Sequence, residues 1–454
     1  MSDRLSRATK FLYGIGDTGF SLTSTIIDVY FLLFLTDVVR IRPGIAAIAI
    51  LVGRTWDYIN DPLIGYFSDR TRTKWGRRRP FLLFGALPYG LAFVLLWWRP
   101  PFESPIALVA YYSLAYIVYE LAATFVYMPY FALTPELTGD YDERTALTSY
   151  RMFFSIFASL LAFTIPGVIV GGFEPQNAPG VLLMGAIFAA LSAAPLWLTF
   201  AGTREREQFM QLKQPTLRQS LRSAKQNRPF IFGLIIFLLT WVCVSILSST
   251  LLFFIKYVVE REPQSEMIMG TIFVIAIFTL PLWEWVSRRL GKQKAYIVGI
   301  AFWAVVQLAL ISLNAATPLW VLFTLAGLAG IGVGAAHVLP WSIIPDAIEW
   351  DEWQTGERHE GMFYSLITLA RKIATSIAVP LVGVVLEITH YNPDLPMQPA
   401  AALTGIRIVI GPIPAVLLVG GILFALAYPL SREKFSQIRD ELEQRRLARK
   451  EPGA

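Results

Sequence analysis

The chain has 454 residues, of which 55% are hydrophobic and only 16% are charged, and its mean hydropathy is +0.53. Soluble domains carry about 25% charged residues, so the composition excludes an ordinary water-soluble protein. The net charge of +6 does not indicate a nucleic-acid partner, because Lys and Arg gather in alternate loops and at the chain ends, as membrane topology requires. The single Cys243 excludes an intramolecular disulfide and a cysteine-based metal site.

Long apolar runs alternate with short polar or Gly/Pro-rich stretches, and a membrane-spanning helix needs roughly 20 apolar residues. We therefore expect an all-α membrane protein with twelve transmembrane helices, near residues 11–37, 45–67, 80–99, 105–135, 149–171, 181–202, 230–258, 265–286, 294–314, 318–345, 360–390 and 402–430. The Lys and Arg asymmetry predicts a multi-pass plasma (inner) membrane protein with both termini cytoplasmic.

The second predicted span carries three ionisable residues. Arg54, Asp57 and Asp61 stand at i, i+3 and i+7, which places them on one helical face. Charges inside a bilayer are costly and mark ion or substrate pathways. Two carboxylates one turn apart predict a Na⁺ or H⁺ site, and Arg54 offsets their charge when the cation leaves. The alternative is a structural salt bridge between Arg54 and one aspartate.

Several features indicate two repeated halves. Basic, glycine-containing loops follow the second and eighth spans, and proline pairs end the fourth and tenth. The longest polar segment between spans separates the sixth from the seventh. We predict an N-terminal six-helix bundle, a cytoplasmic linker, a C-terminal six-helix bundle and a cytoplasmic tail, as in carriers built from two pseudo-repeats. Their bounds are 1–202, 203–229, 230–430 and 431–454.

Further ionisable residues lie in other predicted spans. Arg151 opens the fifth span, where it either lines a cavity or marks the membrane boundary. His337 lies in a Gly-rich span and is either a packed residue or a cavity residue. Lys372 lies roughly 18 Å along its helix from Glu360, so it needs a partner. A carboxylate of the second span would join the two halves there, and snorkelling is the alternative. No role follows from sequence for Asp28, Glu120, Glu387 and Arg407.

Enzymatic chemistry finds no support in the sequence. No second histidine follows His359 at metal-site spacing, and neither a phosphate-binding loop ending in Lys-Ser/Thr nor a nucleophile elbow is present. We therefore predict no enzymatic activity, no ATP-driven transport and no cofactor besides a coupling cation. The two-halved plan with clustered charges favours an alternating-access carrier over a channel.

Short motifs along nearly the whole chain carry a resemblance to a known family. They are Tyr13-Gly14-x-Gly16, Thr36-Asp37-Val38, Arg54-x-x-Asp57-x-x-Asn60-Asp61-Pro62-x-x-Gly65, Thr73-Lys74-Trp75-Gly76, Pro129 to Leu133, Arg151, and Asp351-Glu352-x-x-Thr355-Gly356 to Lys372. The sequence thereby resembles the glycoside-pentoside-hexuronide:cation symporters of the major facilitator superfamily, the group of the melibiose carriers.

The resemblance implies the major facilitator fold, a monomer, and Na⁺, H⁺ or Li⁺ as the driving ion. It implies a cation site formed by Asp57, Asn60, Asp61 and Thr124. It also implies three supporting charges in the cavity, which are Arg54, Arg151 and Lys372.

The expected substrate follows from a departure from that family. Melibiose carriers hold sugar with two acidic residues, and alignment through the quoted motifs puts Ser21 and Tyr127 in those places. The segments from Gly53 to Leu63 and from Leu339 to Asp346 also resemble the sodium-dependent lysophosphatidylcholine symporters. We therefore expect a lysophospholipid, with a glycoside or pentoside as the alternative. A non-transporting membrane scaffold or receptor is a third hypothesis.

Overall fold

The computed structural model describes residues 5–138, 141–205, 224–356, 360–395, 397–430 and 432–450, although the side chains of some residues inside helices lie outside the description. These residues form helices and no strand, with a single antiparallel bridge between Thr73 and Gly76. The chain is an all-α membrane protein, as predicted.

The first predicted span is interrupted. It comprises α1 (Arg7–Gly14), α2 (Asp17–Ile26) and two π-helical turns, η1 (Ile27–Phe31) and η2 (Phe34–Val38). At the break between α1 and α2 the chain packs closely on α7, because a Cβ on Gly14 would come 2.8 Å from that of Tyr150. Turns of π-helix inside α-helices are often found at functional sites.

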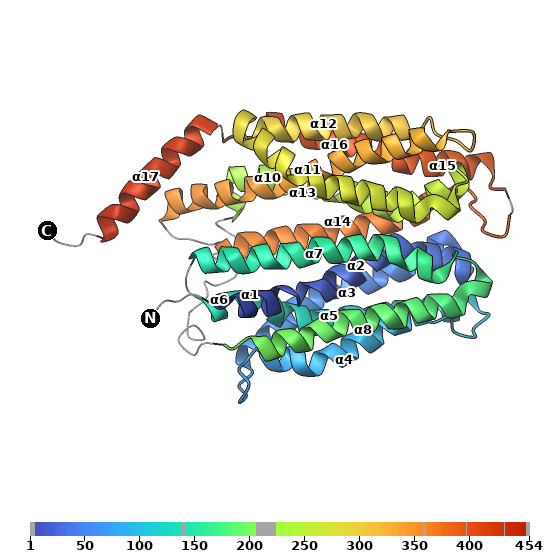
Figure 1. Cartoon of the computed structure of the whole chain (residues 1–454), viewed down its shortest axis with the longest axis horizontal. Helices are drawn as coiled ribbons and strands as arrows, with labels where there is room; N and C mark the ends of the chain where they lie inside the picture. The colour runs from blue at the N-terminus through green and yellow to red at the C-terminus, as the bar shows by residue number, and fades with distance from the viewer. Residues whose placement is uncertain are drawn as a thin grey trace.

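The remaining helices alternate with short connections (Figure 1). The first half continues with α3 (Pro43–Arg70), α4 (Arg79–Leu96), α5 (Pro105–Ala132), α6 (Thr134–Leu137), α7 (Tyr141–Val170), η3 (Pro175–Asn177) and α8 (Ala178–Gly202). The second half comprises α10 (Arg228–Phe253), η5 (Phe254–Val258), η6 (Glu262–Gln264), α11 (Ser265–Leu290), α12 (Lys292–Leu310), α13 (Leu319–Thr355), α14 (Glu360–Ile388), α15 (Ala400–Ile410), α16 (Pro412–Leu426) and α17 (Arg432–Lys450).

Ten helices in the described part are long and apolar enough to cross a membrane. Two predicted spans fall outside this set. The first is broken into short segments, and α3 has only a shorter apolar stretch, Pro43–Trp56, because polar residues occupy its second half. The count of twelve spans therefore stays a prediction.

Three predicted boundaries differ from the structure. Helix α13 was expected to end at 345 but runs on to Thr355 and stops where Gly356 adopts a left-handed conformation, with φ 72°. The last span breaks between α15 and α16 at Gly411, before Pro412. The predicted tail forms helix α17, which packs Ile438 and Leu442 beside Trp350 and Trp353.

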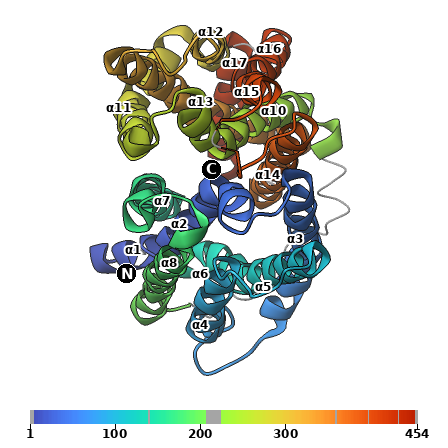
Figure 2. The same cartoon turned by 90° about the vertical axis from the view of Figure 1, so that its right-hand side faces the viewer.

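The helices gather in two groups, α1–α8 and α10–α16 (Figure 2). Helix α3 packs against both α5 and α14, and α7 packs against α11, so α14 and α11 contact the first group. Both chain ends lie at the same end of the bundle (Figure 1). The six-helix repeats and their bounds, including the linker at 203–229, stay predictions.

Candidate functional site

Helix α3 holds the core of the predicted cation site. It is continuous from Pro43 to Arg70, so positions 54, 57 and 61 share one face, as expected. The side chains of Asp57 and Asp61 lie outside the described part of the structure. Asn60 is 2% exposed, and its Nδ2 has no hydrogen-bond partner among the described residues.

Arg54 is held by partners on two other elements. Its Nη2 donates to Asp28 Oδ1 on η1 at 2.5 Å, and its Nε donates to the Tyr116 hydroxyl on α5 at 2.9 Å. The guanidinium is therefore paired with the first span, a role for Asp28 that the sequence did not give. The Ser249 hydroxyl on α10 donates to the Asp28 carbonyl at 2.9 Å, which ties this point to the second half of the chain.

The packing of α5 against α3 indicates the level at which Thr124 stands. A Cβ on Gly53 would come 2.5 Å from that of Tyr116, so α3 and α5 meet closely there. Because one helix, α4, lies between them in the chain, we infer that α3 and α5 run in parallel. One and two turns from this contact, positions 57 and 61 of α3 then stand level with Glu120 and Thr124. Thr124 is buried, at 5% exposed.

Helix α14 brings Lys372 to the same level from the second half. The Gly44 amide donates to Glu387 Oε2 at 3.0 Å, which gives Glu387 a structural role. A Cβ on Gly383 would come 2.7 Å from that of Ala47. These contacts set an antiparallel register between α3 and α14. Following it inward, the turn of α14 that holds Lys372 stands level with positions 57 to 61.

A second charged pair joins α2 to α7. Arg151 Nε lies 3.5 Å from Asp17 Oδ2, and its guanidinium stacks 4.5 Å from the centre of the Phe131 ring. One turn further along α2, the hydroxyls of Ser21 and Ser155 share a hydrogen bond of 2.6 Å. Arg151 is therefore paired with the neighbouring helix.

Tyr127 is packed among aromatic rings on α5. Its ring centre lies 5.0 Å from that of Phe20 and 5.4 Å from that of Tyr89. The residue is 3% exposed, and its hydroxyl has no hydrogen-bond partner among the described residues. Tyr127 therefore presents its hydroxyl within an aromatic wall that includes Phe20 and Tyr89.

His337 and Arg371 flank the same indole ring in the second half. The His337 Nδ1–H donates to the Val333 carbonyl at 2.9 Å, and its ring lies edge-on to Trp241 at 5.1 Å. The Arg371 guanidinium stands 4.6 Å over the Trp241 ring. Sequence reasoning assigned Arg371 no role, because nothing near it in the chain indicates what it faces.

Arg407, the last of the unassigned charges, has a structural contact. Its Nη2 donates to the Leu313 carbonyl at 3.2 Å. The side chain therefore joins α15 to the segment after α12, away from the candidate site.

A buried polar cluster lies at the other end of the first span, where segments of the two halves meet. We call it the Asp37 cluster; it consists of Thr36, Asp37, Lys256, Tyr257 and Tyr391. Asp37, 2% exposed, accepts hydrogen bonds from the Lys256 ammonium at 3.1 Å, from the Tyr391 hydroxyl at 2.5 Å and from the Tyr257 hydroxyl. Burial, with the nearby Asp37 carboxylate, raises the pKa of the Tyr391 phenol, so it keeps the proton that it donates.

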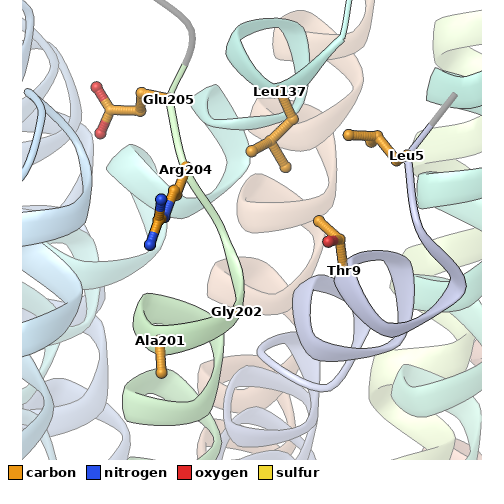
Figure 3. Close-up of a pocket in the computed structure, with 7 residues that line it drawn as sticks. All are labelled: Leu5, Thr9, Leu137, Ala201, Gly202, Arg204 and Glu205. Atoms are coloured by element: carbon orange, nitrogen blue, oxygen red, sulfur yellow. The ribbon is translucent and has the colours of Figure 1, made fainter. Parts of the chain in front are cut away.

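A separate cavity of about 310 Å³ opens near the N-terminus. Figure 3 shows Leu5 and Thr9 facing Leu137, with Arg204 on the segment that follows α8. Because these residues lie at the end of the bundle, the cavity is distinct from the candidate cation site.

Comparisons with known proteins agree with this architecture. The family model described as "MFS/sugar transport protein" matches residues 12–432. An uncharacterized symporter of Synechocystis sp. is 31% identical, over 98% of this chain and 98% of its own. The sodium-dependent lysophosphatidylcholine symporter 1-A of Danio rerio is 27% identical, over 94% of this chain and 86% of its own.

The chain is also similar to an isoprimeverose transporter and to the solved structure of a symporter. The isoprimeverose transporter of Lactiplantibacillus pentosus is 27% identical, over 88% of this chain and 83% of its own. The crystal structure of a D-xylose-proton symporter superposes with a TM-score of 0.67 at 16% identity, covering 92% of this chain and 96% of that one. The likeness to the D-xylose-proton symporter concerns the fold alone.

Proposed function

Because the chain belongs to the MFS/sugar transport protein family, we propose that it is a sodium-coupled symporter that moves a lysophospholipid-like amphiphile by alternating access. The proposal is supported above all by the contacts of α3 with α5 and α14, from whose registers we infer that the positions of Asp57, Asp61, Thr124 and Lys372 stand at one level of the bundle.

The cation part of the proposal follows from the ligands that Na⁺ prefers. Carboxylate, amide and hydroxyl oxygens are hard ligands for such an ion, and Asp57, Asp61, Asn60 and Thr124 supply these three types. The sequence predicted that Arg54 offsets the carboxylates when Na⁺ leaves. Because Arg54 is paired with Asp28, we assign this role instead to Lys372, which the sequence predicted only as a partner of a second-span carboxylate.

Coupling follows from where the partners are anchored. Asp57 and Asp61 belong to α3 of the first half, whereas Lys372 belongs to α14 of the second half. A change in the charge at α3 therefore alters the attraction between the two halves. Moving one monovalent cation down a potential of about 100 mV supplies ~2.3 kcal/mol, before any concentration term, which is enough to concentrate a substrate appreciably.

The substrate part rests on relatives and on the apolar surroundings of Tyr127. A lysophosphatidylcholine symporter is among the relatives, and Ser21 and Tyr127 offer hydroxyls and rings in place of acids. A cation-coupled sugar symporter is the second candidate, because the isoprimeverose transporter is a relative of similar identity.

Uptake by purified protein in proteoliposomes tests the function. With an imposed Na⁺ gradient, we expect accumulation of labelled lysophosphatidylcholine and none of a panel of labelled glycosides. Glycoside uptake alone would establish the second candidate. Substrate binding without uptake or counterflow would contradict transport and indicate a scaffold or receptor.

The cation site gives the first mutational prediction. Asp57→Asn and Asp61→Asn should each lower Na⁺-stimulated uptake at least tenfold, because loss of a charged ligand costs about 1.5–3 kcal/mol. Uptake against Na⁺ concentration, at matched protein levels, measures this. Glu284→Gln, which neutralises an exposed carboxylate paired with Arg288, is the control. Unchanged Na⁺ dependence in both aspartate variants would remove the proposed site.

A further inference from the structure

Among the described residues, Arg371 is a cation without a carboxylate partner, on α14 of the chain's second half. Arg54 and Arg151 each lie within ion-pair distance of an aspartate. Within the described ranges, no such partner stands within 4.0 Å of Arg371. A charge inside a membrane protein is costly and marks a substrate or ion pathway unless it is paired.

The position of Arg371 places it between the halves. It lies on α14, the helix that packs against α3, and it is within electrostatic range of Asp28 and Asp17 on the first span. The residue is exposed, although aspartates of the other half lie in electrostatic range. An accessible cation on this helix, with no carboxylate partner among the described residues, is placed to meet a solute.

Two neighbouring side chains complete a set of hydrogen-bonding groups. The Trp241 ring lies under the guanidinium. Its Nε1–H is buried and has no acceptor among the described residues, which is costly until an acceptor arrives. Because His337 donates its Nδ1–H to Val333, its Nε2 is an acceptor in the neutral ring.

We infer that Arg371, Trp241 and His337 form a subsite for an oxyanion on the transported substrate. The guanidinium and the indole N–H donate to the oxyanion, and His337 Nε2 accepts from a hydroxyl next to it. The inference rests on the proposed transport function and specifies a charged group that the substrate carries.

The subsite matches a phosphate or a carboxylate with a neighbouring hydroxyl. A planar guanidinium binds such groups through paired N–H donors. A lysophospholipid offers a phosphate and a glycerol hydroxyl, and a sugar acid offers a carboxylate and ring hydroxyls. The shared chemistry is the oxyanion, and neutral analogues of both substrates lack it.

Binding to the purified full chain distinguishes these sources. The probes are palmitoyl lysophosphatidylcholine against monopalmitoylglycerol, and nitrophenyl glucuronide against nitrophenyl glucoside, each with and without Na⁺. Lysophosphatidylcholine carries its phosphate oxyanion in a zwitterion and the glucuronide carries a carboxylate; we call these two the anionic probes. We expect one of them to bind at least tenfold more tightly than its neutral analogue. Arg371→Gln should remove about ten- to hundredfold of that affinity, the size of a charged hydrogen bond, and leave the neutral analogue unchanged.

Trp241→Phe has a matched control in the same half. Trp303 on α12 is also buried with an unpartnered Nε1–H, and it is not one of the three subsite residues. Trp241→Phe should weaken the anionic probe several-fold, whereas Trp303→Phe should not change its affinity relative to the neutral one.

The inference is overturned if neutral probes bind as tightly as anionic ones, or if Arg371→Gln weakens both members of a pair equally. An equal loss would indicate that Arg371 serves the packing of the halves. Sodium-driven uptake of a neutral glycoside would sink the oxyanion subsite and leave the symporter function standing. Tight binding of an anionic probe without uptake would contradict the symporter function and leave the oxyanion subsite standing.

Discussion

Each of two charges inside the spans is neutralised by a side chain of another helix. The Arg54 and Asp28 side chains are 8% and 23% exposed in their ion pair, and Arg151 pairs similarly with Asp17. Removing one partner of a buried pair leaves an uncompensated charge and costs about 3–5 kcal/mol. These pairs therefore fix how the first span packs on α3 and α7.

The Arg54–Asp28 pair gives a stability prediction at this scale. Asp28→Asn should lower the melting temperature of the detergent-purified protein by several degrees, because Arg54 then stays buried without its counter-ion. The double variant with Arg54→Gln should recover part of the loss, since no charge is left unpaired. Additive losses in a double-mutant cycle would contradict a direct interaction. The exposed Glu284–Arg288 pair should contribute about 0–1 kcal/mol and serves as the control.

At the scale of elements, the Asp37 cluster joins four segments of the chain. Asp37 lies on η2, Lys256 and Tyr257 lie on η5, and Tyr391 follows α14. The Lys256 ammonium also donates to the Phe173 carbonyl at 3.4 Å, in the connection after α7. A buried carboxylate with several donors therefore ties the first half to the second at this end.

Breaking the cluster should loosen this end of the molecule. Asp37→Ala removes the acceptor of three donors from the second half, so Ser249→Cys, at a buried position on α10, should react several-fold faster with a water-soluble maleimide. An unchanged rate would contradict a closing role for the cluster.

A matched control for this experiment exists at the same end. Arg40 forms an ion pair with Asp394 at 2.9 Å, and both side chains are partly exposed. Because exposed pairs contribute little, Arg40→Gln should leave the reaction rate nearly unchanged. The native Cys243 is buried and should not react in either variant.

For the whole molecule, the membrane orientation is open to direct measurement. The positive-inside rule predicts that the loop after α3 faces the cytoplasm and the loop after α4 faces the other side. With Cys243 replaced by Ser, a cysteine at Lys74 should resist an impermeant maleimide in intact cells, and one at Glu103 should react. Both positions are exposed. The reverse pattern would invert the topology.

Much of the fold could be predicted from local patterns. Apolar runs of spanning length predicted most helices within a few residues. The motif from Arg54 to Asp61 predicted a cation site on α3, and that site stays a prediction. The interruptions at Gly14–Gly16 and at Gly411 were missed, because the apolar runs continue through both. The extension of α13 was missed because a polar helix beyond the membrane carries no apolar signal.

The sequence by itself determined that this is a membrane protein, that its fold is all-α and that one helix carries Asp57 and Asp61. It could do so because hydropathy, spacing and charge asymmetry are properties of neighbouring residues. Only the tertiary structure decided the partners of the charges. Arg54 meets Asp28 across 26 residues, Tyr391 meets Asp37 across 354, and Arg371 meets no carboxylate within 4.0 Å in the described part. Such pairings depend on how helices pack, and no local pattern encodes which faces meet.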